Sequence, residues 1–181
     1  MAELWVFGYG SLMWRPGFPY LECRPATLLG AHRALCVYSW VHRGTRQRPG
    51  LVLGLDRGGA CRGMAFRVAE AEAARVVAYL RAREQVTAVY LERHRPIRFS
   101  GGGTDTALAY LVDRTHAQYA GKLDLATQLA LVADAEGRSG ANRDYVLNTA
   151  AHLAELGISD AALEWLAEKL RHTAYAETSS A

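Results

Sequence analysis

The segment Trp5-Val-Phe-Gly-Tyr-Gly-Ser-Leu-Met-Trp14 decides how the chain is interpreted, because an apolar run ends there in a glycine-containing turn. The residues before Gly8 are typical of a short buried strand. Glycines allow backbone angles and close approaches that side chains forbid, so successive N–H groups can converge on one anion. Tyr9 and Ser11 add hydroxyl groups, and Leu12 adds an apolar anchor. The segment predicts a ligand-binding turn, and an ordinary glycine turn with a buried tyrosine is the alternative.

Three common motifs do not fit this segment. A dinucleotide-binding Gly-x-Gly-x-x-Gly needs glycine where Met13 stands, and a phosphate-binding P-loop needs a lysine that the segment lacks. A nucleophile elbow around Ser11 needs glycines at positions 9 and 13. Without a base at a recognisable spacing, Ser11 is expected to be a poor nucleophile.

Composition favours a cytoplasmic globular protein. The chain has 181 residues, of which half are hydrophobic and 22% are charged, as in ordinary soluble domains. No apolar run is long enough for a membrane span, no secretory signal is recognisable, and the three cysteines form no Cys-x-x-Cys unit. We expect one domain over residues 1–173 and a flexible tail over residues 174–181.

The order of elements predicts an α+β fold. Residues 70–84 have helical periodicity with acidic residues in the first turn, and the chain from Leu123 onward is expected to be helical. Asp56-Arg-Gly-Gly59 is a strong hairpin signal. Strands are expected at residues 4–7, 27–40, 51–55, 62–68, 87–99 and 106–112.

Two capped helices are expected near the C-terminus. Asn142 is the candidate N-cap of a helix that Gly157 ends. Ser159 or Asp160 is the candidate N-cap of the next helix. That helix carries one apolar face, made of Leu163, Leu166, Ala167 and Leu170.

Glu84 is the candidate catalytic residue. It continues a row of residues spaced by three or four on the helix of residues 70–84, namely Ala73, Val77 and Leu80. Its neighbours Arg81 and Arg83 are expected to point elsewhere. Burial raises a carboxyl pKa and makes the group a general base near neutral pH. The alternative is a frayed helix end with a solvated Glu84 that pairs with an arginine.

Metal and nucleic-acid partners are not expected. The six histidines show no metal-ligand spacing, so no metal is predicted. Nearly all the positive charge is arginine, which suits carboxylates or phosphates, but no RNA-binding motif accompanies it. Tyr110, in a predicted strand, is a core tyrosine by default.

Together these segments resemble the ChaC family of γ-glutamylcyclotransferases, which act on glutathione. The turn with a downstream Arg83-Glu84 is the most specific part of the resemblance. The further matching segments are residues 16–20, 42–45, 49–50, 61–67, 79–84, 109–111, 119–121 and 139–142, with Tyr145. The resemblance implies a small mixed β-barrel with surrounding helices and a helical C-terminal region.

The resemblance also implies the site and the reaction. The substrate-binding turn falls on Tyr9, Gly10, Ser11 and Leu12, the general base on Glu84, and Tyr110 on a tyrosine near the same pocket. Glutathione would be cleaved to 5-oxoproline and Cys-Gly without a cofactor. Departures from the family pattern at position 41 and after position 84 leave open other γ-glutamyl amines or amino acids as substrates, and a non-catalytic binding module is the rival interpretation.

Overall fold

The computed structural model describes residues 3–85 and 88–178, and the side chains of residues 174–178 are not described. Contacts divide the chain into two compact units. The first comprises Met1–Ala34 and Leu53–Tyr119, and the second comprises Leu35–Val52 and Ala120–Ala181. Two long strands, β2 (Glu22–Ser39) and β3 (Gly50–Val68), contribute residues to both units.

The first unit is a closed five-stranded barrel with one helix, and it confirms the expected fold class. The strand order is β1-β3-β2-β4-β5, and further pairings of β5 with β1 and β3 close the barrel. β1 (Leu4–Gly8) pairs antiparallel to β3, with Val6 opposite Phe66. β4 (Tyr90–Phe99) pairs antiparallel to β5 (Thr104–Val112) across the turn of residues 100–103.

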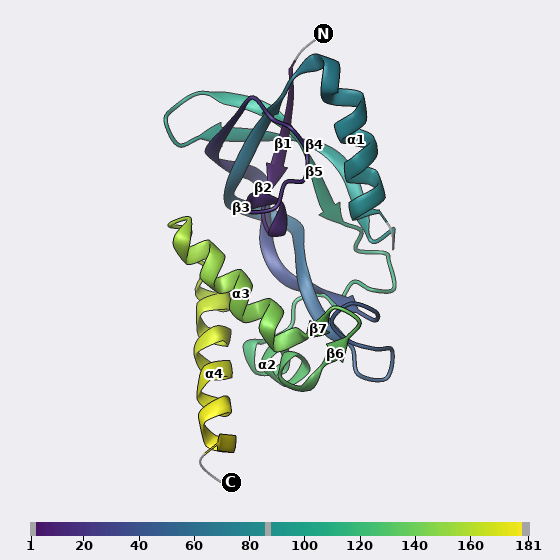
Figure 1. The fold of residues 1–181 in the computed structure, drawn as a ribbon, viewed down its shortest axis with the longest axis vertical. Helices are drawn as coiled ribbons and strands as arrows, with labels where there is room; N and C mark the ends of the chain where they lie inside the picture. Colours follow the sequence, from purple (N-terminus) through teal and green to yellow (C-terminus); the bar gives the residue numbers. More distant parts are fainter. Residues whose placement is uncertain (1–2, 86–87, 179–181) are drawn as a thin grey trace. The chain divides into compact units, whose positions relative to one another are not determined.

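Helix α1 (Glu70–Glu84) has the predicted bounds and lies alongside the barrel strands (Figure 1). Its buried residues are Val76 and Leu80, which join an apolar cluster with Val6, Phe66 and Leu108 from the strands. Burial of large apolar side chains stabilises such a contact by roughly 1.5–3 kcal/mol for each side chain. The cluster therefore fixes α1, and with it the side chains of its last turn, against the barrel.

The hairpin predicted at residues 56–59 is wrong, since β3 continues through this segment. Asp56 is buried instead of forming an exposed turn, and its carboxylate accepts hydrogen bonds from Arg114 Nε at 2.7 Å and Tyr119 Oη at 2.8 Å. Gly58 and Gly59 have positive φ angles, which only glycine adopts without strain. The glycine pair is thus accommodated within the strand.

The second unit contains a short hairpin that the sequence did not predict, between helix α2 (Leu125–Asp134) and helix α3 (Asn142–Glu155). Strands β6 (Glu136–Gly137) and β7 (Gly140–Ala141) pair through Glu136–Ala141 and Gly137–Gly140. Gly140 has a φ of +104°. The positive φ takes the chain out of the helical conformation, so this part of the predicted helical region is wrong.

The helix termini give a mixed outcome. Gly157 follows α3 with a φ of +68°, and Leu163 N donates to Asp160 Oδ1 at 3.1 Å at the start of α4 (Ala161–Thr178), as expected. Asn142, however, is not an N-cap, since it is the first residue of α3 and its buried side chain binds Leu51. The predicted apolar face of α4 is buried, with Leu163, Leu166, Ala167 and Leu170.

The predicted tail at residues 174–181 overlaps the end of α4 and includes residues 179–181, which lie outside the described part, as do residues 86–87 of the segment after Glu84. In the described part of the chain, no helix is long and apolar enough to cross a membrane. The single domain over residues 1–173 stays a prediction.

Candidate active site

The glycine-containing turn follows β1 directly. The chain leaves the strand at Gly8 and forms a short 3-10 helix, η1 (Ser11–Met13), which begins with a hydrogen bond from Met13 N to Gly10 O at 2.9 Å. A side chain at position 8 would lie only 3.1 Å from Leu12 Cβ, so glycine permits this close packing. The predicted anchoring of the turn in the core by Leu12 is confirmed, because its side chain is buried.

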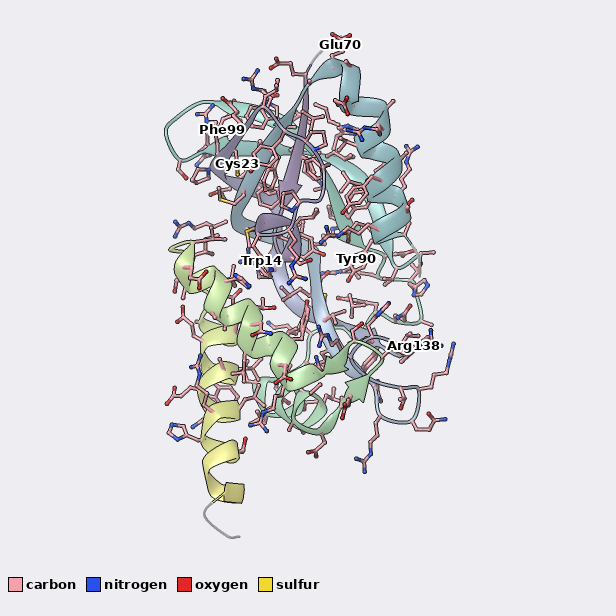
Figure 2. All side chains as sticks on the ribbon, viewed as in Figure 1. Trp14, Cys23, Glu70, Tyr90, Phe99 and Arg138 are labelled. Atoms are coloured by element: carbon pink, nitrogen blue, oxygen red, sulfur yellow. The ribbon has the colours of Figure 1, made fainter. Side chains whose placement is uncertain are left out.

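Tyr9 and Ser11, two further residues of the turn, differ in their burial. Tyr9 is buried, and its backbone carbonyl accepts a hydrogen bond from Arg33 Nε at 2.7 Å. Ser11 is exposed. Glu70, at the start of α1, lies at one end of the barrel, whereas Trp14 and Tyr90 lie toward the other end (Figure 2). Arg83, in the last turn of α1, donates hydrogen bonds to Ser11 Oγ at 2.8 Å and to Arg15 O at 2.7 Å, so the turn and the end of α1 are in contact.

Glu84 is the last residue of α1, and its side chain is only 16% exposed. Desolvation by burial raises the pKa of its carboxyl, and the nearby charge of Arg83 opposes this rise. The helix persists to Glu84 and the side chain is mostly buried, so a frayed helix end and a solvated Glu84 are ruled out, although Glu84 does pair with an arginine as that alternative expected. The row that leads to it differs in detail from the prediction, because Val76 and Leu80, rather than Ala73 and Val77, are the buried residues.

Arg83 contacts Glu84, which corrects the expectation that this arginine points elsewhere. Arg83 Nε lies 3.3 Å from Glu84 Oε1, and an Nη atom donates to Ser11 Oγ at 2.8 Å. Adjacent Cβ atoms do diverge on a helix, but the long arginine side chain bends back to its neighbour. One guanidinium therefore joins the predicted base to the predicted binding turn.

Arg81 pairs with a different carboxylate from Arg83. It forms a two-pronged ion pair with Glu92 on β4, with distances of 2.8 and 2.9 Å. Tyr110 Oη donates to the same carboxylate at 3.1 Å. Arg81 is the main reason why the pKa of Glu92 lies below its usual value. Burial, followed by the charge of Glu92, raises the pKa of Tyr110, and the charge of Glu84 adds to the rise.

Within the first unit, Arg83 links Ser11 to Glu84 directly, and Glu84 is in electrostatic contact with Tyr110. The sequence interpretation missed the roles of Arg83 and Glu92. The Arg83-Glu84 pair was visible as a motif, but the reach of its guanidinium to Ser11 depends on tertiary structure. Glu92 gave no signal, because a charged residue in a strand is commonly a solvated one.

The His42-Arg43-Gly44 segment lies in the second unit and has structural contacts there. His42 Nδ1 shares a hydrogen bond with Ser139 Oγ at 2.9 Å, and Arg43 donates to the carbonyl of Ala141 at 3.3 Å. An open hollow of about 690 Å³ adjoins this segment. It includes none of the predicted site residues, and its lining consists of Trp40, Val41, Gly44, Thr45, Glu136, Gly137 and Arg138.

The family described as ChaC-like protein matches residues 4–173. This chain belongs to the ChaC-like family. The chain is 34% identical to the glutathione-specific γ-glutamylcyclotransferase of Escherichia coli (strain K12), with 88% of this chain and 69% of the relative covered. It is 32% identical to γ-glutamylcyclotransferase 2-3 of Arabidopsis thaliana, with 93% and 89% covered.

A solved structure shares the fold of this ChaC-like chain. The crystal structure of a γ-glutamylcyclotransferase specific to glutathione from yeast superposes with a TM-score of 0.83 at 21% identity. The match covers 95% of this chain and 99% of the yeast chain. The recognition of the family and the predicted barrel fold are thus confirmed.

Proposed function

We propose that this ChaC-like protein is a γ-glutamylcyclotransferase that cleaves glutathione to 5-oxoproline and Cys-Gly. Relatives named for this activity match most of the chain at 32–34% identity. The observation that carries the proposal is the sheltered carboxyl of Glu84, joined through Arg83 to Ser11 in the turn. A desolvated carboxylate next to a binding turn is suited to proton transfer on a bound substrate.

The reaction requires only a folded substrate and a proton carrier. The α-amine nitrogen of the γ-glutamyl group attacks its own γ-carbonyl carbon, and a five-membered lactam forms. The bond from that carbon to the cysteinyl nitrogen breaks. Two protons leave the attacking ammonium in total, and two reach the leaving nitrogen, so no proton is gained or lost. Holding the amine against the carbonyl accelerates such an intramolecular step by fixing the orientation of the reacting atoms.

Glu84 is proposed as the proton carrier. An ammonium has no lone pair, so a base must deprotonate the α-amine before it attacks. Glu84 takes this proton and then delivers it to the leaving nitrogen. Burial supports this role, because a raised pKa makes the carboxylate a better proton acceptor and its acid form a usable donor near neutral pH.

The turn of residues 9–12 and Tyr110 are proposed to bind the γ-glutamyl group. Gly10 and Leu12 would offer backbone N–H groups, and Tyr9 and Ser11 would complete the turn around the substrate. Hydrogen-bond donors at such a turn can hold a carboxylate or stabilise negative charge on the γ-oxygen. Tyr110 would contribute through its hydroxyl, which donates a hydrogen bond to Glu92.

The redox state of the cysteines indicates the cellular compartment in which the protein works. Cys23, Cys36 and Cys61 are free thiols. Free thiols persist in reducing compartments, and the proposed substrate is a cytoplasmic thiol. We therefore place the reaction in the cytoplasm. Expression of a tagged chain followed by fractionation tests this assignment, and recovery from an oxidising compartment with paired cysteines would contradict it.

The decisive experiment measures the products. Purified protein is incubated with glutathione, and 5-oxoproline and Cys-Gly are quantified together, because equal amounts show cyclisation rather than hydrolysis. A panel of γ-glutamyl amino acids and γ-glutamyl amines runs in parallel. Turnover of the panel but not of glutathione would support the broader cyclotransferase. Binding of these compounds without any 5-oxoproline would support the non-catalytic module and contradict the proposal.

A further inference from the structure

Arg83 uses every nitrogen of its guanidinium, although it lies in the last turn of a helix and its side chain is 24% exposed. Nε faces the carboxylate of Glu84, and the two Nη atoms reach residues in and after the turn. The nearest atoms are Glu84 Oε1 at 3.3 Å, Ser11 Oγ at 2.8 Å, Arg15 O at 2.7 Å, Pro16 O at 3.4 Å and Tyr79 Oη at 3.2 Å.

We infer that Arg83 is a positioning residue of the reaction, which holds the turn at Ser11 and the carboxyl of Glu84 at a fixed separation. The inference rests on the proposed function. Ser11 comes from the segment after β1, and Glu84 from the end of α1, so tertiary contacts set their spacing. The guanidinium contacts both at once, and its planar, branched donors are rigid enough to transmit that geometry.

A purely structural arginine would not need this arrangement. The carbonyls of Arg15 and Pro16 alone would fasten the segment after the turn to α1. The additional contacts go to the two side chains that the proposed reaction uses. Arg81, two residues earlier, differs from Arg83 in its contacts. Its guanidinium forms two hydrogen bonds to the carboxylate of Glu92, so Arg81 cannot replace Arg83.

The charge of Arg83 has a second consequence at the same carboxyl. Desolvation raises the pKa of Glu84, and Arg83 lowers it again, so the arginine keeps more of the base ionised than burial alone would. Tyr110 on β5 is also in electrostatic contact with Glu84, and it is neutral over the working range because its own pKa is raised. Arg83 is therefore the cation that tunes this base.

Two substitutions separate the effect of the Arg83 charge from the effect of its contact geometry. Arg83→Lys keeps the charge but cannot form the branched set of contacts, whereas Arg83→Gln removes the charge. The matched control is Arg75→Gln, which removes an exposed arginine of the same helix that pairs with Glu72 at the surface. Thermal unfolding of each variant verifies folding, and kcat, KM and the pH profile of kcat/KM are then measured with glutathione.

We expect both Arg83 variants to lose roughly tenfold or more in kcat/KM through misplacement of the turn and the base. In Arg83→Gln the acid limb of the profile moves to higher pH, by roughly half a pH unit or more for a partly exposed pair. In Arg83→Lys this limb stays close to that of the wild type. Arg75→Gln is expected to match the wild type in all three quantities.

The outcomes distinguish this inference from the proposed function. Wild-type kinetics and an unmoved acid limb in Arg83→Gln would overturn the inference while the activity stands. If the wild type forms no 5-oxoproline from any γ-glutamyl compound, the proposed function fails. Arg83 is still tested in that case by NMR titration of ¹³Cδ-labelled glutamates, assigned with Glu84→Gln, since an unchanged Glu84 titration in Arg83→Gln would refute the contact.

Discussion

Asn142 holds the backbone of Leu51 by both of its polar groups. Its amide nitrogen donates to Leu51 O at 2.8 Å, and its amide oxygen accepts from Leu51 N at 2.8 Å. Asn142 is fully buried, and it begins α3, so this pair fastens the helix to the start of β3 within the second unit. Asparagine is suited to the task because its side chain carries a donor and an acceptor side by side, as a peptide group does.

Asn142→Ala should destabilise the protein by roughly 2–4 kcal/mol, because it leaves a buried N–H and a buried carbonyl without partners. Asn142→Asp should also destabilise it, because a carboxylate cannot donate to Leu51 O. The control is Asn148→Ala, which removes an exposed asparagine of the same helix. Urea unfolding measures all three. Equal midpoints for the Asn142 and Asn148 variants would contradict this role.

Glu84→Gln should reduce kcat by roughly 100-fold or more while the binding of glutathione persists, because the amide cannot accept the substrate proton. The same change should stabilise the folded protein at neutral pH. A carboxyl with a raised folded pKa stabilises the fold below its ordinary value of 4.5, and this contribution is lost as the pH rises through the folded pKa.

The stability advantage of Glu84→Gln over the wild type should therefore grow as the pH rises above 4.5. Glu92→Gln is the control of opposite sign, because Arg81 lowers the pKa of Glu92. Its wild-type contribution is present above the ordinary carboxyl pKa and is lost on acidification. Chemical unfolding across a pH series measures the free energy of unfolding of both variants relative to the wild type. If the two differences changed with pH in the same direction, burial of Glu84 would be refuted as the cause of the pH dependence.

Ser11→Ala removes the hydroxyl that accepts from Arg83, and it should weaken kcat or raise KM by roughly fivefold or more without unfolding the protein. Ser100→Ala, at an exposed site in the β4–β5 turn, is the control. In a double-mutant cycle with Arg83→Lys, the two losses should not add, because both break one contact. Strict additivity would show that the hydroxyl and the guanidinium act independently.

Tyr110→Phe should lower kcat/KM more than a similar loss of a hydroxyl elsewhere in the protein, because it removes a hydroxyl from the proposed site. The matched control is Tyr90→Phe, which removes a phenol hydroxyl on β4 that donates to the carbonyl of Leu53 at 2.8 Å. Each variant should lose about 1 kcal/mol of stability through one hydrogen bond. Equal kinetic losses in the two variants would remove Tyr110 from the list of binding residues.

Gly17→Ala should destabilise the protein and reduce activity. Gly17 has a φ of +73°, and an added Cβ would lie 2.1 Å from Tyr79 Oη, the group next to Arg83. Gly121→Ala separates strain from the clash, because its φ is +74° with no atom within 4 Å of the new Cβ. Kinetics and thermal unfolding are measured for both variants, and only Gly17→Ala should lose activity. Similar losses of activity in the two variants would show that the contact with Tyr79 is not the cause.

The fold was largely predictable where local patterns and tertiary structure agree. The bounds of α1 followed from its periodicity and its acidic first turn, and Gly157 followed from its conformational freedom. The errors arose where tertiary contacts override local signals. Asp56 belongs to a turn-like sequence, yet it lies in a continuous strand, where its buried carboxylate accepts hydrogen bonds from Arg114 and Tyr119.

The candidate site was predictable in its members but not in its connections. The position of Glu84 after Leu80 indicated a sheltered carboxyl. The path of Arg83 to Ser11 was not readable, because it joins residues separated by 72 positions in the sequence. Helical spacing also misled, since it describes the directions of Cβ atoms and not the reach of a long flexible side chain.

The single turn of α1 between Leu80 and Glu84 also limits how the chain can change length. A helix advances by about 100° per residue, so one inserted or deleted residue there would rotate the carboxyl out of phase with the buried leucine. The guanidinium of Arg83 would swing away by the same angle. A scan of one-residue insertions and deletions between Leu80 and Glu84 should therefore abolish cyclisation at every position.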